Sequence, residues 1–146
     1  LTNWNRLYGN RGFYQYQFVV PHDSDLRVVR AALIEIANSE LPSFLGVIKE
    51  MGDKSNGLLS FPIPGTTIAV DFPNVGDRLH NLLERLDHLV VEAGGRVYLT
   101  KDARLSLELF RRMYPEWESW REIRDSSDPN GMFASELGRR LGLVKE

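Results

Sequence analysis

The sequence predicts an α+β fold in which two helices cover one face of a small antiparallel sheet. Apolar and polar residues alternate over residues 12–20 and 66–72, as expected for strands with one buried face. Residues 75–93 instead place apolar side chains three and four positions apart, which is typical of an amphipathic helix. The predicted order is strand, helix, strand, strand, helix, strand. This is the ferredoxin-like βαββαβ plan, followed here by a helical C-terminal segment.

The first strand is expected over residues 12–20, which are aromatic and β-branched and are closed by Pro21. Gln15 and Gln17 share one face of this strand, because successive side chains point to opposite sides. The other face is apolar and carries Tyr14, Tyr16, Phe18 and Val20. This strand therefore has one core face and one polar face.

A helix should follow, capped by Asp23 or Ser24 and ending near Asn38. Its buried stripe is predicted from the spacing of Leu26, Val29, Leu33 and Ile36. The second strand is expected over residues 44–51, with Lys49 on the same side as Leu45 and Val47.

The third strand is restricted to residues 66–72 by the prolines around it, since proline cannot donate to a sheet ladder. The following helix, residues 75–93, has the clearest period in the chain and ends at Gly94 and Gly95. One face of the predicted sheet collects polar side chains, namely Gln15, Gln17, Lys49, Thr67 and Asp71. Such polarity is costly in a core, so this face is expected to meet polar partners or a ligand.

The fourth strand is predicted over residues 96–100 and is followed directly by Lys101, Asp102 and Arg104. Charged residues in this place are typical of a solvated strand end. The remaining chain reads as helical: a helix over residues 105–113 ends before Pro115, and Ser135 can cap a short final helix.

Composition excludes several classes of function. The net charge is −2, from 18 basic and 20 acidic residues, which disfavours nucleic acid as the main partner. Without cysteine there is no thiolate zinc site, and His22, His80 and His88 lack metal-ligand spacing, so no metal is expected. Dinucleotide and phosphate-loop glycine motifs are also absent. The residues alone leave a small-molecule ligand-binding module without catalysis as one interpretation.

Several segments resemble the C-terminal half of FAD-linked oxidases of the vanillyl-alcohol oxidase superfamily. They are WNRLYG, GFYQYQFVVP, LSFPIPG, IAVDFP, GGRVYLTKDAR, MYPEW and DPNGMFASELGRRLGL. The resemblance implies that residues 1–146 are the substrate-binding cap domain of a larger FAD-dependent oxidoreductase, with the FAD-binding domain of the same protein as its partner. FAD would be bound mainly by that other domain.

The resemblance also assigns roles to individual residues. A Tyr-x-x-Lys pattern falls on Tyr98 and Lys101, which implies that both lie near the flavin and that Lys101 stabilises charge during oxidation of an alcohol. Both can serve one site only if the strand bends near Thr100. Gln15, Gln17, Lys49 and Thr67 correspond to substrate-binding positions.

The implied substrate is a sugar-like secondary alcohol, because the motifs are most similar to those of oxidases that act on a prenylphosphoryl ribose for arabinose-containing cell-wall precursors. Thr66, Thr67 and Ala69 depart from the residues of those enzymes, so a polyol or aldonolactone oxidase remains the alternative. With a lipid-linked substrate, the protein is expected in the cytoplasm or peripherally at the membrane.

Overall fold

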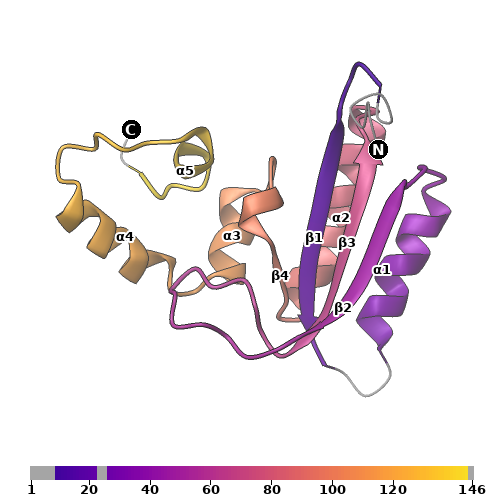
Figure 1. Ribbon diagram of the computed structural model, residues 1–146, viewed down its shortest axis with the longest axis horizontal. Helices are drawn as coiled ribbons and strands as arrows, with labels where there is room; N and C mark the ends of the chain where they lie inside the picture. The colour runs from indigo at the N-terminus through magenta and orange to yellow at the C-terminus, as the bar shows by residue number, and fades with distance from the viewer. Residues whose placement is uncertain (1–8, 23–25, 145–146) are drawn as a thin grey trace, which may run out of the picture.

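The computed structural model describes residues 9–22 and 26–144 of the chain. A four-stranded sheet has the order β2-β3-β1-β4, and every neighbouring pair is antiparallel (Figure 1). The strands are β1 (Phe13–Pro21), β2 (Leu45–Met51), β3 (Gly65–Pro73) and β4 (Arg96–Val97). Together with the order of helices, this arrangement confirms the predicted ferredoxin-like α+β fold.

Two helices, α1 (Arg27–Asn38) and α2 (Asp77–Glu92), lie together on one side of the sheet (Figure 1). The predicted caps of α1, Asp23 and Ser24, lie outside the described residues. The predicted buried stripe of α1 is only partly right, because Val29 and Ala32 are buried whereas Leu26 and Leu33 are exposed. Ala32 is fully buried, and the residue after it, Leu33, points to the solvent side of the helix.

The core lies between the sheet and these helices, as the alternation predicts. Strand residues and α2 residues supply most of it: Phe18, Val20, Ile68, Phe72, Leu79, Leu82, Leu83 and Leu86 are each at most 1% exposed. Burial of such side chains contributes about 1.5–3 kcal/mol each relative to solvent exposure. The other face of the sheet carries the polar side chains.

The last strand is shorter than the predicted residues 96–100. The Tyr98 amide still donates to the Gln17 carbonyl at 2.8 Å, but the chain then turns into a 3₁₀ segment, η2 (Leu99–Lys101). The Lys101 and Asp102 amides donate to the Tyr98 and Leu99 carbonyls instead of to β1. The bend expected near Thr100 is therefore present, and Lys101 lies in a turn rather than in a strand.

The C-terminal segment forms α3 (Leu107–Met113), α4 (Trp117–Ser127) and α5 (Glu136–Arg140) beside the β4 end of the sheet (Figure 1). Ser106 caps α3, which begins two residues later than predicted, and Ser135 caps α5 as predicted. None of the helices among the described residues is long and apolar enough to cross a membrane.

Candidate active site

The strand register brings the predicted substrate-binding residues onto one face of the sheet, on the side opposite α1 and α2. Thr67 pairs with Lys49 on β2, and Gln15 pairs with Asp71 on β3. Gln17 lies between Ala69 on β3 and the extended residue Tyr98, whose amide bonds to the Gln17 carbonyl. We call this surface the polar sheet face; it comprises Gln15, Gln17, Lys49, Thr67, Asp71 and Tyr98.

Gln17 and Thr67 form the buried centre of the polar sheet face. The Gln17 side-chain amide donates to the Thr67 hydroxyl at 3.1 Å, and that hydroxyl donates to the Phe18 carbonyl at 2.7 Å. Gln17 is 6% exposed and Thr67 is fully buried. This chain of hydrogen bonds satisfies buried polar groups and fixes the orientation of the glutamine.

Lys49 and Gln15 flank this centre. Lys49 is exposed on the edge strand β2, and within the described part of the chain its ammonium makes no hydrogen bond or ion pair. Gln15 is half-buried, opposite the buried Asp71. The rim of the polar sheet face thus carries a cation beside neutral hydrogen-bonding groups, which suits a polar ligand.

Tyr98 and Lys101 lie at the β4 end of this face, where the chain leaves the sheet. The Tyr98 ring stacks on Phe61 with centroids 4.5 Å apart and an interplanar angle of 29°. Lys101 is half-buried, and no acidic or hydrogen-bonding partner for its ammonium exists among residues 9–22 and 26–144. A half-buried ammonium that is not neutralised locally is suited to meet negative charge on a ligand.

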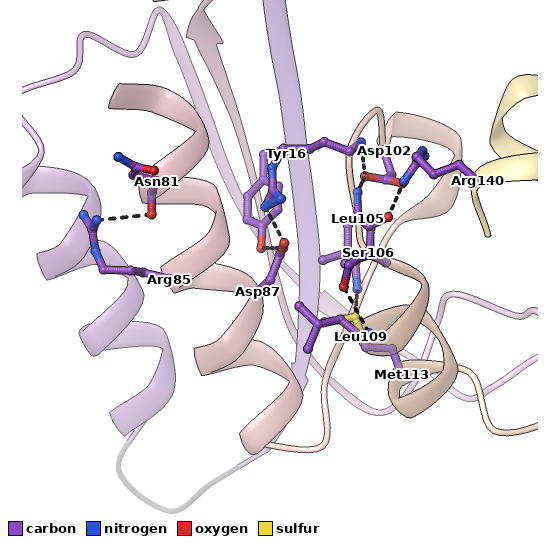
Figure 2. Close-up of polar contacts among 12 residues, drawn as sticks. Tyr16, Asn81, Arg85, Asp87, Asp102, Leu105, Ser106, Leu109, Met113 and Arg140 are labelled. Atoms are coloured by element: carbon purple, nitrogen blue, oxygen red, sulfur yellow. Dashed lines mark hydrogen bonds and ion pairs between the residues drawn. The ribbon is translucent and has the colours of Figure 1, made fainter. Parts of the chain in front are cut away.

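Asp87 is a buried charge that the sequence analysis did not identify. Its side chain is 1% exposed and accepts a hydrogen bond from the Tyr16 hydroxyl at 2.8 Å (Figure 2). It also forms an ion pair with Arg104. Burial raises the pKa of Asp87 to about 6, although Arg104 and Tyr16 both act to lower it. Burial, and then the nearby Asp87 charge, also raise the pKa of Tyr16 well above its ordinary value.

The residues after Lys101 are not a solvated strand end, which corrects the simple interpretation of the sequence. The Asp102 side chain is 4% exposed and accepts from the amides of Arg104 and Leu105 at 2.9 and 2.8 Å. Its second oxygen pairs with Arg140 of α5 at 2.7 Å, and Arg140 also donates to the Leu105 carbonyl (Figure 2). Asp102 and Asp87 are thus both engaged with arginines.

One signal in the sequence could have revealed Asp87. It lies four residues after Leu83 and three before Val90, inside the apolar stripe of α2, where a charge needs a partner. The identity of that partner, Arg104, has no local signature because the contact joins separate elements.

The two histidines of α2, His80 and His88, have different surroundings. His80 contacts the Tyr14 hydroxyl at 3.2 Å and packs edge-on against its ring, while His88 is exposed. Within the described part of the chain, no group of three or more histidine, aspartate or glutamate residues could hold a metal ion.

Residues 69–141, half of the chain, match the family model described as D-arabinono-1,4-lactone oxidase. The chain belongs to the D-arabinono-1,4-lactone oxidase family. This family is one of FAD-linked oxidases, and the matched region includes the second half of β3, all of α2 and the Lys101 turn. The resemblance found in the sequence motifs is therefore confirmed at the family level.

Two relatives of this D-arabinono-1,4-lactone oxidase family member extend the comparison over nearly the whole chain. A decaprenylphosphoryl-beta-D-ribose oxidase of Mycolicibacterium smegmatis is 46% identical over 97% of the chain. An uncharacterized protein in the mprA 5' region of Streptomyces coelicolor is 38% identical over 98% of it. The chain spans only 30% and 39% of the lengths of these two relatives.

Proposed function

We propose that this chain forms the substrate-binding side of the active site in an FAD-dependent oxidoreductase that oxidises a secondary alcohol of a sugar-like substrate. The observation that carries the proposal is the polar sheet face, which ends at Tyr98 and the half-buried Lys101. Family membership supports the reaction class, and the shorter length of the chain supports an FAD-binding domain elsewhere in the same protein.

The residues at the end of the polar sheet face fit a flavin and an alcohol. FAD, when bound, accepts the hydride that leaves the carbinol carbon of the substrate. Tyr98 offers an aromatic ring already stacked on Phe61, and Lys101 offers an ammonium that no described acidic residue neutralises. Both residues would contact the cofactor as well as the substrate.

Lys101 would act on the alcohol in two ways. Its ammonium can donate a hydrogen bond to the substrate hydroxyl, which orients the carbon–hydrogen bond that breaks. It also favours the negative charge that develops on the substrate oxygen as the hydroxyl gives its proton to water and the carbon gives its hydride to the flavin, which leaves a carbonyl. Removing one such preorganised donor typically costs about 10²–10³ in rate.

The remaining residues of the polar sheet face would bind the sugar. Gln15 and Gln17 carry amides that suit sugar hydroxyls, Thr67 orients Gln17, and Lys49 suits a phosphate or another anionic group at the rim. Because Lys49 is exposed on the edge strand β2, its ammonium can reach a large substrate that extends out of the site.

Two substrate classes are favoured by different observations. The Mycolicibacterium smegmatis relative is named as an oxidase of decaprenylphosphoryl ribose, which supports a prenylphosphoryl ribose and matches the rim cation Lys49. The family description names an aldonolactone, which carries no phosphate. With the lipid-linked substrate, the protein would work in the cytoplasm or at the membrane surface.

The deciding experiment uses the longer protein with FAD bound. Anaerobic mixing with a short-chain prenylphosphoryl ribose, an aldonolactone or a polyol is followed by the loss of flavin absorbance. The preferred substrate should bleach the wild type, and Lys101→Ala should bleach at least about a hundredfold more slowly, a loss of roughly 2.7 kcal/mol. The matched control is Lys54→Ala. Lys54 lies on the loop of residues 52–64 and pairs with Glu116, so this variant should react as the wild type does.

Equal bleaching of the wild type and Lys101→Ala would remove Lys101 from the site. Binding of a sugar ligand without bleaching by any candidate would instead favour a ligand-binding module without catalysis. Faster reduction by the aldonolactone or polyol than by the prenylphosphoryl ribose would assign the protein to the alternative substrate class.

A further inference from the structure

The turn that carries Lys101 has little structure of its own. Among the described residues, two backbone hydrogen bonds close η2: the Lys101 amide donates to the Tyr98 carbonyl at 3.0 Å, and the Asp102 amide donates to the Leu99 carbonyl at 3.2 Å. A single 3₁₀ turn with two bonds is a weak element, because such turns are short and their hydrogen-bond geometry is poor. The position of Lys101 must therefore be set by the residues that flank the turn.

The side before the turn is held by the sheet and by α3. The Tyr98 amide donates to Gln17 at 2.8 Å, and the Tyr114 hydroxyl donates to the Val97 carbonyl at 2.6 Å. Both contacts are backbone-directed, so they fix the path of the chain up to Tyr98.

The side after the turn is held by a first ion pair. Asp102 directly follows Lys101, and its carboxylate binds the amides of Arg104 and Leu105 as well as the Arg140 guanidinium. Arg140 binds the Leu105 carbonyl at the same time (Figure 2). This pair joins the end of the turn to Arg140 of α5, which lies 38 residues after Asp102 in the chain.

A second ion pair holds the same segment from the other direction. Arg104 reaches Asp87 on α2, and Asp87 is in turn oriented by the Tyr16 hydroxyl from β1. The side chains of Arg104 and Asp87 are 20% and 1% exposed, so water screens this interaction little. Two charged contacts thus act on residues 102–104 from α5 and from α2.

We propose that these two ion pairs, Asp102–Arg140 and Asp87–Arg104, form an ion-pair clamp that positions the Lys101 ammonium at the active site. The four residues are positioning residues, because they act through the turn and not on the substrate. The inference rests on the proposed function for its catalytic consequence, whereas the ordering of the turn does not depend on that function.

The chemistry of the clamp suits this role. Charge-assisted hydrogen bonds are short and directional, and a guanidinium that binds two acceptors fixes orientation as well as distance. A lysine has a long flexible side chain, so its ammonium is held in place only if its backbone is held first. A displacement of about 1 Å at a reacting group can cost about a hundredfold in rate.

The test is a double-mutant cycle in the longer protein with FAD bound. Asp102→Asn, Lys101→Ala and the double variant are compared by the rate of anaerobic flavin reduction with the preferred substrate. Asp102→Asn should slow reduction at least about tenfold in the wild-type background and less than about twofold in the Lys101→Ala background. Arg140→Gln and its conservative counterpart Arg140→Lys serve as second variants if Asp102→Asn folds poorly, with Arg140→Lys recovering part of the rate.

Hydrogen exchange supplies a readout that does not depend on turnover. Asp102→Asn should raise the exchange of the Lys101 and Asp102 amides while the α2 amides stay protected. The matched control is Arg112→Gln, which removes the exposed ion pair between α3 and Glu92 and should change neither the rate nor the exchange of the turn.

The outcomes separate this proposal from the proposed function. Two outcomes would overturn the clamp and leave the role of Lys101 intact. In the first, Lys101→Ala slows flavin reduction but Asp102→Asn does not. In the second, Asp102→Asn slows flavin reduction by the same factor in the wild-type and the Lys101→Ala backgrounds. A wild-type rate for Lys101→Ala overturns the proposed function and the catalytic consequence of the clamp together. Unchanged exchange of the turn in Asp102→Asn overturns its ordering by the clamp in every case.

Discussion

The side-chain amide of Gln17 on β1 donates to the hydroxyl of Thr67 on β3 at 3.1 Å, across the buried centre of the polar sheet face. The Thr67 hydroxyl in turn donates a hydrogen bond to the Phe18 carbonyl at 2.7 Å. Gln17 is therefore held in one orientation before any ligand arrives, and its amide oxygen has no partner among the described residues. A preorganised acceptor of this kind binds a ligand hydroxyl at a lower entropic cost.

Thr67→Val should weaken substrate binding. Valine has nearly the shape of threonine but cannot accept from Gln17, so a buried donor is left unsatisfied at a cost of about 1–3 kcal/mol. The expected result in the longer protein is a Kd for the preferred substrate, measured from the substrate dependence of flavin reduction, that rises about threefold to thirtyfold. The limiting rate of reduction should change much less.

Thr66→Val is the matched control for this change. Thr66 is the neighbouring buried residue on the opposite face, where its hydroxyl donates to Glu50 at 3.0 Å. Thr66→Val should therefore leave the Kd for the substrate unchanged. If the two variants raise the Kd equally, the Gln17–Thr67 contact has only a structural role.

The raised pKa of Asp87 predicts a specific pH dependence of stability. An aspartate in the unfolded chain has a pKa near 3.8, whereas burial raises it to about 6 in the folded protein. Below pH 3.8 the carboxyl is neutral in both states; as the pH rises to about 6 the unfolded state loses its proton first, which favours unfolding. The stability associated with the protonated group is therefore lost as the pH rises through about 6.

Asp87→Asn removes this titration. The difference in free energy of unfolding, wild type minus variant, should decrease by roughly 3 kcal/mol at most between pH 4 and pH 7, the amount that corresponds to pKa values of 3.8 and about 6. Denaturant unfolding of the longer protein at several pH values measures it. The charged and titratable groups that face Asp87 are Tyr16, His80, Glu84, His88, Asp102, Arg104 and Glu108. A difference that stays constant or grows with pH would contradict the burial of a raised-pKa carboxyl here.

Gly65→Ala should disrupt the pairing of β1 with β3. A Cβ at this position would lie 2.0 Å from the Val20 carbonyl oxygen and 2.8 Å from its carbon, so the backbone of one strand would have to move. The expected destabilisation is at least about 1–3 kcal/mol, as for overpacked cores, and is measured by thermal unfolding. Gly46→Ala on β2 is the control, since no described atom outside residues 45–47 lies within 4 Å of its added Cβ. Equal melting temperatures for the two variants would show that the strands separate easily at Gly65.

The sequence predicts the fold well because its strands and helices are encoded by local periodicity. The alternation in β1 and β3 separates the core face of the sheet from its polar face, and the three-to-four spacing in α2 separates most buried from exposed positions. The prediction fails where periodicity is weak or interrupted. In α1 the small Ala32 takes the central buried position, and at β4 the chain turns after Tyr98 because its next amides bond within η2.

The sequence by itself determined the order of elements and the family to which the chain belongs. It also determined that four polar residues lie on the same face of the sheet, namely Gln15, Gln17, Lys49 and Thr67. Only the tertiary structure decided the surroundings of Lys101: the bend after Tyr98, the burial of Asp102 and the engagement of Asp87 with Arg104. The physical reason is the range of the interactions. Periodicity acts over a few residues, whereas these ion pairs join residues 17 and 38 positions apart, and such pairing is specified by packing and charge in three dimensions.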